Sequence, residues 1–94
     1  MTRGPRRLVS LRRAVPDTVR ARYDELWSAA QNAAVGLGAH AWRFSELSGS
    51  GRYLEFLEFA AGADPRADPS VSGRLAELET EFGAAQAEEW AECP

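Results

Sequence analysis

Ala39-His-Ala-Trp-Arg-Phe44 and Arg52-Tyr-Leu-Glu-Phe-Leu-Glu-Phe59 flank the loop Ser48-Gly-Ser-Gly51, and together these segments decide the fold. The first segment alternates small or charged residues with His40, Trp42 and Phe44, and the last is rich in aromatic residues, as strands are. Glycine takes the positive φ angles of a hairpin loop without steric cost. The pattern therefore predicts a strand, a hairpin loop and a second strand.

The second of these strands has an alternative interpretation. Glutamate favours helix, and four apolar residues also recur at helical spacing, namely Tyr53, Phe56, Leu57 and Ala60. We prefer the strand, because Leu54 and Phe59 fall off that stripe and the first strand needs a partner. A helix over Arg52–Ala61 would instead make the chain an all-helical association module.

One strand and one helix are predicted before the hairpin. Leu8–Val15 alternates as a half-buried strand, although Arg13 interrupts its apolar side. Pro16 suits the first turn of a helix, and the glycines at positions 36 and 38 suit its end. Between them, apolar residues recur every three or four positions along one stripe, which we expect to face the core: Val19, Tyr23, Leu26, Trp27, Ala30, Ala34 and Leu37.

A second helix is predicted after the hairpin. Two Asp-Pro pairs mark Ala61–Pro69 as a connector. A further helical stripe follows, consisting of Val71, Leu75, Leu78, Phe82 and Ala85. Ala87–Pro94 then has two interpretations: Trp90 anchors a short final strand, or the helix continues to the end. The composition of this segment favours the helix.

Length and composition indicate one small domain over residues 1–94, because a chain of 10.3 kDa buries too little surface to form two cores. The basic residues 1–6 are expected to form a flexible tail. Cys93 is the only cysteine, which excludes an intramolecular disulfide. Every basic residue is arginine and isoleucine is absent, which is typical of a GC-rich bacterial coding sequence.

Charge is distributed unevenly along the chain. The first 22 residues contain seven arginines and one acidic residue, whereas residues 61–94 contain two arginines and eight acidic residues. Such a basic head and acidic tail can meet within one subunit or between two. Nucleic-acid binding is not predicted, because the arginines lack interleaved aromatic residues and the whole chain is acidic.

Two further classes of protein are not predicted. No apolar run approaches the roughly 20 residues that span a bilayer, so we expect no membrane association. The N-terminal arginines are not followed by the apolar core of a signal peptide. The expected location is therefore cytoplasmic.

The predicted element order is most of a ferredoxin-like α+β unit, in which an antiparallel sheet carries both helices on one face. The other face is too apolar to meet water, so something must cover it. On this order, and on the segments His40–Phe44 and Arg52–Phe59, the chain resembles the dimeric α+β barrel superfamily from about Leu8 to Glu89. The resemblance implies a homodimer whose two sheets close face to face.

The resemblance also implies an activity, since this superfamily includes cofactor-independent oxygenases and isomerases that act on aromatic, polyketide-like substrates. The chain departs from those oxygenases because Asn32, its only asparagine, lies on the first predicted helix and not on the first strand. The fourth strand of the family has to come from the ambiguous segment after Ala87.

His40 is the only histidine and the first candidate catalytic residue. In one hairpin register it faces Glu58, and a carboxylate at that place orients an imidazole as a general base. In the register shifted by one residue it faces Phe59. The alternative to a catalytic role is that His40 is simply a hydrogen-bonded residue of the sheet.

An aromatic group is the second candidate site, because it would line a pocket for a flat apolar ligand: Trp42, Arg43, Phe44, Tyr53 and Phe56. His40, Arg43 or Tyr53 would bind the polar end of that ligand. The same aromatics would equally fill a closed dimer core. No metal site is predicted, because the ligand spacing is missing, and no cofactor is expected.

Two hypotheses about function follow. The first is a small homodimer that binds a hydrophobic small molecule or serves as an interaction or regulatory subunit. The second is the cofactor-independent monooxygenase or isomerase that the resemblance implies.

Overall fold

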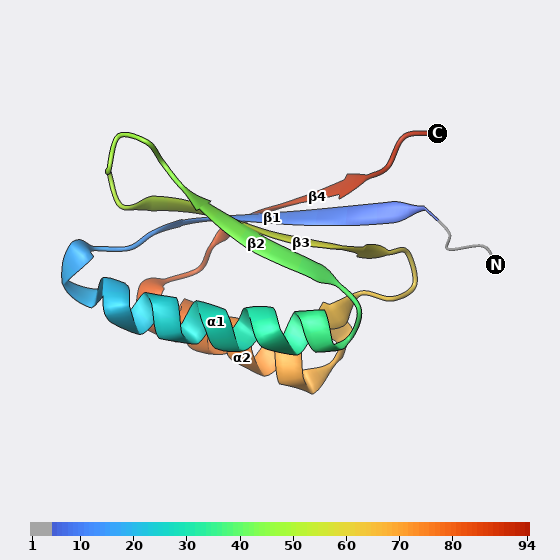
Figure 1. Cartoon of the computed structure of the whole chain (residues 1–94), viewed down its shortest axis with the longest axis horizontal. Coiled ribbons are helices and arrows are strands. Elements are labelled where there is room, and N and C mark those ends of the chain that lie inside the picture. The colour runs from blue at the N-terminus through green and yellow to red at the C-terminus, as the bar shows by residue number, and fades with distance from the viewer. Residues whose placement is uncertain (1–4) are drawn as a thin grey trace.

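The computed structural model describes residues 5–94, in which a four-stranded antiparallel sheet carries two helices on one face (Figure 1). The strands are β1 (Arg6–Ala14), β2 (His40–Ser45), β3 (Arg52–Ala60) and β4 (Gln86–Ala91), in the spatial order β2-β3-β1-β4. The helices are α1 (Arg20–Gly36) and α2 (Pro69–Phe82), each preceded by a single 3₁₀ turn, η1 (Asp17–Val19) or η2 (Pro65–Ala67). The predicted ferredoxin-like α+β fold is confirmed.

The hairpin forms as predicted, and β3 is a strand. Along β3 buried and partly exposed residues alternate without interruption, which is the two-residue period of a strand with one face against the core. The helical interpretation of this segment, and with it the all-helical module, is wrong. The reason is that β2 and β1 pair with β3 on its two edges, so that sheet hydrogen bonds outweigh the helix propensity of glutamate.

The stripe of α1 packs on the sheet, with Tyr23 and Trp27 almost completely buried. Val19 and Leu37, at the two ends of the predicted stripe, are exposed because the helix begins at Arg20 and ends at Gly36.

The predicted connector provides the N-terminal cap of α2, since the Asp68 carboxylate accepts the backbone N–H of Ser70.

The C-terminal segment corrects one prediction. Helix α2 ends at Gly83, where a φ of 87° suits glycine, so Ala85 lies outside it. Gln86–Ala91 then pairs with β1 as β4, although its composition favours helix. Pairing with the free edge of β1 overrides that preference, and Trp90 anchors the strand by donating its Nε1–H to Ser10 Oγ over 3.3 Å.

The first and last strands lie side by side, because β1 and β4 are neighbours in the sheet (Figure 1). Arg12 pairs with Glu88, Arg22 pairs with Glu81, and Glu92 accepts the backbone N–H of Arg6. The basic head and the acidic tail therefore meet within one subunit. Most of the expected tail at residues 1–6 lies outside the described residues, and β1 begins at Arg6. Neither helix within residues 5–94 has the length and hydropathy to cross a membrane.

A buried ion pair explains why Arg13 interrupts the apolar side of β1. Its guanidinium donates to both carboxylate oxygens of Glu55 on β3, over 3.0 and 3.3 Å, and the two side chains are 2% and 0% exposed. The hydroxyl of Tyr23 on α1 donates to the same carboxylate over 2.6 Å. Burial and the nearby carboxylate raise the pKa of this hydroxyl, so it stays protonated and remains a donor.

We expect Glu55→Gln to lower the free energy of unfolding by about 3–5 kcal/mol, because it leaves the Arg13 guanidinium buried without its counter-charge. The matched control is Glu88→Gln, which removes the exposed partner of Arg12 and should cost less than about 1 kcal/mol. Chemical denaturation followed by tryptophan fluorescence measures both. Equal effects of the two substitutions would contradict this account of the core.

Candidate functional site

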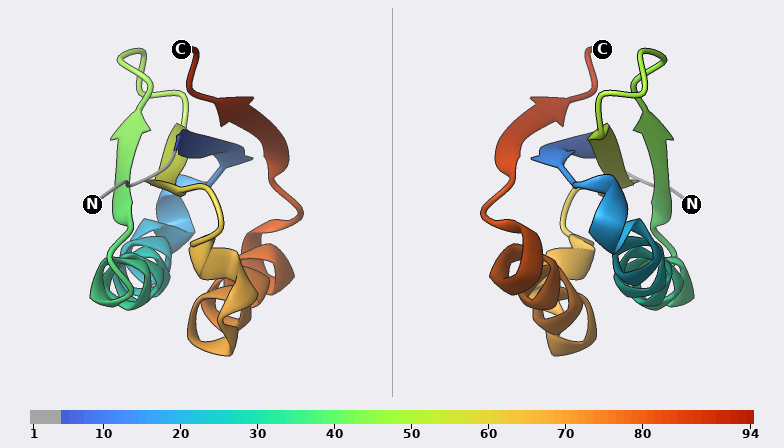
Figure 2. Two further views of the ribbon diagram at one scale, coloured as in Figure 1. Left: turned by 90° about the vertical axis from the view of Figure 1, so that its right-hand side faces the viewer. Right: turned by 90° about the vertical axis from the view of Figure 1, so that its left-hand side faces the viewer.

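The face of the sheet that the helices leave open is concave. Viewed along the sheet, β2 and β4 lie on either side and curl away from the helices, with β1 and β3 between them (Figure 2). We call this concave surface the trough. Alternate residues of a strand point to the same face of a sheet, so every second residue of each strand faces the trough. These residues include Leu8, Ser10, Arg12, His40, Trp42, Phe44, Leu54, Phe56, Glu58 and Trp90.

Aromatic side chains occupy the middle of the trough. Trp42 and Phe56 lie opposite each other on β2 and β3 and stack with ring centroids 5.5 Å apart. Phe44 meets the edge of the same Phe56 ring at 5.8 Å. These three predicted ligand-binding residues are therefore brought together by the structure.

The hairpin adopts the register in which His40 faces Glu58. The His40 Nδ1 and Glu58 Oε1 atoms are 2.9 Å apart, and the other carboxylate oxygen accepts from Arg6 Nε, also over 2.9 Å. The hydrogen bond from Arg6 is the main reason why the pKa of Glu58 lies below its ordinary value. Glu58 is therefore a carboxylate, which can only accept, so Nδ1–H of His40 donates the hydrogen bond. In the neutral tautomer with this arrangement the lone pair lies on Nε2.

This pair lies beside a depression of about 390 Å³ at one end of the trough. Trp42 on β2 and Trp90 on β4 border it, with Leu8 and Glu58 from the strands between them. Two indole side chains and a leucine make an apolar surface suited to a flat ring system. We call this the histidine end of the trough.

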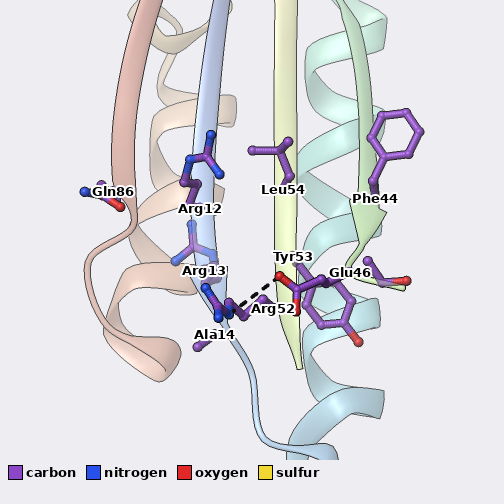
Figure 3. Close-up of a pocket in the computed structure, with 10 residues that line it drawn as sticks. Arg12, Arg13, Ala14, Phe44, Glu46, Arg52, Tyr53, Leu54 and Gln86 are labelled. Atoms are coloured by element: carbon purple, nitrogen blue, oxygen red, sulfur yellow. Dashed lines mark ion pairs between the residues drawn. The ribbon is translucent and has the colours of Figure 1, made fainter. Parts of the chain in front are cut away.

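A second depression, of about 410 Å³, lies at the opposite end (Figure 3). Its apolar surface comes from Phe44, Leu54 and Ala14, and its charges come chiefly from Arg12, Arg52 and Glu46. We call this the arginine end. Tyr53 borders it as well, but that side chain is 92% buried, since its ring lies on the helix side of the sheet against Tyr23.

Arg43 is not brought together with the aromatic group. It lies on the helix side of β2, where its guanidinium is 2.8 Å from the Asp24 carboxylate and 5.0 Å above the Tyr23 ring. Successive residues of a strand point to opposite faces of the sheet, so Arg43 lies on the face opposite to its sequence neighbours Trp42 and Phe44.

Several residues of the trough were missed by sequence reasoning. Trp90 escaped because its segment reads as helix, and Arg6 because it was assigned to the tail. Leu8 and Arg12 could have been found, because each lies two positions from Ser10 on the first strand, and alternate residues of a strand face the same side. Within residues 5–94 no three or more His, Cys, Asp or Glu side chains gather closely enough to hold a metal ion.

The strand order and the two helices on one face define a ferredoxin-like α+β protein with an open, concave sheet. No family model and no curated protein matches the chain. Several solved structures match the chain over almost its whole length.

A conserved protein from Bacteroides thetaiotaomicron, described as a "possible oxidoreductase", has a TM-score of 0.76 and 12% identity over 97% of this chain and 100% of its own. A "putative antibiotic biosynthesis monooxygenase" from Bordetella bronchiseptica has a TM-score of 0.73 and 11% identity over 96% and 99% of the two chains. A variant of SnoaB, a cofactor-independent oxygenase from Streptomyces nogalater, has a TM-score of 0.71 and 10% identity over 96% and 92%. The chain therefore shares the fold of antibiotic biosynthesis monooxygenases, as the resemblance to dimeric α+β barrels predicts.

The depressed pKa of Glu58 makes a prediction about stability. Because the pKa is lower in the folded than in the unfolded chain, the stabilisation is complete above the ordinary glutamate value of about 4.3 and is lost as the pH falls through the folded value. We expect Glu58→Gln to flatten this part of the pH profile of the free energy of unfolding. Urea denaturation between pH 6 and about pH 3 measures it, and an unchanged acid limb in the variant would show that Glu58 does not contribute.

Proposed function

We propose that the chain forms a homodimer that works as a cofactor-independent monooxygenase on an aromatic, polyketide-like substrate. The observation that carries the proposal is the His40–Glu58 pair on the open sheet face, whose carboxylate borders the depression between Trp42 and Trp90. The fold that the chain shares with a cofactor-independent oxygenase supports it, and so does the shared fold of antibiotic biosynthesis monooxygenases.

His40 is the general base in this proposal. Glu58 holds Nδ1–H by a hydrogen bond, so that Nε2 accepts a proton from the substrate. Arg6 acts through Glu58, because it holds the second carboxylate oxygen and keeps that group ionised. Trp42 and Trp90 hold the ring system of the substrate between them.

The reaction takes place at a CH₂ carbon that two aromatic rings make acidic. His40 removes one proton, and the resulting carbanion supplies electrons to dioxygen and forms a C–O bond. The peroxide anion then takes the proton back from His40 and becomes a hydroperoxide. Loss of the second C–H proton and cleavage of the O–O bond then release water and leave a ketone. One oxygen atom enters the product and the other leaves in water, so that the four-electron oxidation of carbon balances the reduction of dioxygen.

The open face gives the reason for a dimer. Phe44 and Trp90 are 55% and 52% exposed in the single chain, beside the partly exposed Trp42 and Phe56. An apolar area of this kind on a sheet marks an interface. A second copy placed over the trough would exclude water from the proposed base and enclose the substrate.

One observation favours a second candidate function, the binding of a hydrophobic small molecule without turnover. The His40 side chain is 69% exposed in the single chain, and Asn32 lies on α1, on the other side of the sheet from the trough. No asparagine or glutamine is among the described residues that line the histidine end. This end is therefore sufficient for binding but has no neutral side-chain amide to stabilise a developing oxyanion.

Turnover tests the first proposal. Anthrone is a suitable probe, because its CH₂ group lies between two aromatic rings and its oxidation by dioxygen yields anthraquinone and water. We expect His40→Ala to reduce kcat by about 100-fold or more while the melting temperature stays within a few degrees. Arg74→Ala, an exposed change on α2, is the control. Oxygen uptake and the absorbance of anthraquinone measure the rate, and full activity of His40→Ala would remove the catalytic role.

The dimer has its own test. We expect Trp42→Glu to convert the dimer to monomer, because it places a carboxylate in the centre of the apolar face. Val35→Glu is the matched control, since Val35 is an exposed apolar residue of α1 on the opposite layer. Native mass spectrometry counts the subunits and reports any retained ligand. A Trp42→Glu protein that remains dimeric would exclude this face as the interface.

A further inference from the structure

The arginine end of the trough has a chemistry of its own, which the proposed reaction does not use. Arg12 lies on β1 opposite Leu54, and Arg52 lies on β3 two residues before Leu54. Both arginines border the apolar surface that Leu54 forms with Phe44 (Figure 3). Two guanidinium groups beside an apolar surface fit a ligand with an aromatic body and an anionic substituent.

Both guanidinium groups remain able to bind an anion, because their present partners hold them weakly. Arg12 Nε lies 3.5 Å from Glu88, and Arg52 Nε lies 3.8 Å from Glu46. The two arginine side chains are more than half exposed, and exposed ion pairs at such distances contribute little free energy. A bidentate carboxylate would bind either guanidinium better than its present partner does.

Glu46 has other partners that satisfy its charge. The hydroxyls of Ser48 and Ser50 both donate to its Oε1 atom, and these hydrogen bonds lower the pKa of Glu46. The carboxylate therefore stays in place when Arg52 turns toward a ligand. Arg13 also borders this depression, but its guanidinium is occupied by Glu55 and by the carbonyl of Gly83.

The two ends of the trough are connected. Phe56 contacts both Trp42 at the histidine end and Phe44 at the arginine end. Glu58 and Leu54 are four residues apart on β3, which corresponds to about 13 Å. Arg12 lies directly opposite Leu54. A single ligand lying along the strands can therefore contact both ends.

We propose that the arginine end binds the anionic substituent of the ligand, so that the substrate class is an elongated aromatic acid whose charged group lies at the opposite end of the trough from the carbon that faces His40. The orientation toward His40 rests on the proposed function. The preference for an anionic aromatic ligand does not rest on it, because it follows from Arg12, Arg52 and the apolar surface that both arginines border.

Two fluorescent probes test this preference in the 94-residue chain. 1-Anilinonaphthalene-8-sulfonate and N-phenyl-1-naphthylamine share one aromatic skeleton, and only the first carries an anionic group. We expect the sulfonate to bind more tightly, with an affinity that falls as salt concentration rises. Arg12→Gln and Arg52→Gln should each weaken sulfonate binding by about fivefold and change binding of the neutral probe by less than about twofold.

Arg74→Gln is the matched control, because it removes an exposed arginine on α2 that also has a glutamate partner. The proposal is overturned if the arginine-end variants weaken both probes equally, if they affect neither, if Arg74→Gln has the same effect, or if neither probe binds. Anthrone carries no anionic group, so its turnover reports the proposed reaction, whereas the difference between the two probes reports the anion site. Loss of one can therefore be told apart from loss of the other.

Discussion

The buried ion pair between Arg13 and Glu55 is the interaction on which the sheet depends. It joins β1 to β3 on the helix side, and Tyr23 extends it to α1. A shift of either strand by one residue would move one of these charges to the open face and leave the other buried without a partner. The pair therefore determines the register of the two central strands, and with it which of their residues face the trough.

That register places the polar residues in two groups, one on each face of the sheet. On the helix side Arg13, Glu55 and Arg43 are engaged in internal pairs and are not available to a ligand. On the open side His40 and Glu58 form a polar pair at one end, and exposed arginines lie at the other. The aromatic residues between them make the trough continuous. Its chemistry is therefore different at its two ends, which is what an elongated ligand with one polar terminus requires.

The fold places this site without determining its chemistry. The compared structures share the ferredoxin-like fold at 10–12% identity, so the likeness says nothing about individual side chains. The proposed base, the aromatic surface and the exposed arginines belong to this chain's own side chains. These side chains come from all four strands, and Arg6 and Trp90 lie on the first and the last of them.

Local pattern in the sequence determined both helices, the hairpin and the ferredoxin-like order, because strand alternation and helical stripes are properties of neighbouring residues. It also indicated His40, Glu58, Trp42, Phe44 and Phe56, although two registers remained open. Only the tertiary structure decided the register, the strand character of Gln86–Ala91 and the location of Arg43, since each depends on pairing with residues far away in the sequence. Local propensity carries no information about such partners. Pairing with the free edge of β1 outweighs the helix propensity of Gln86–Ala91, and Arg43 pairs with the Asp24 carboxylate on α1.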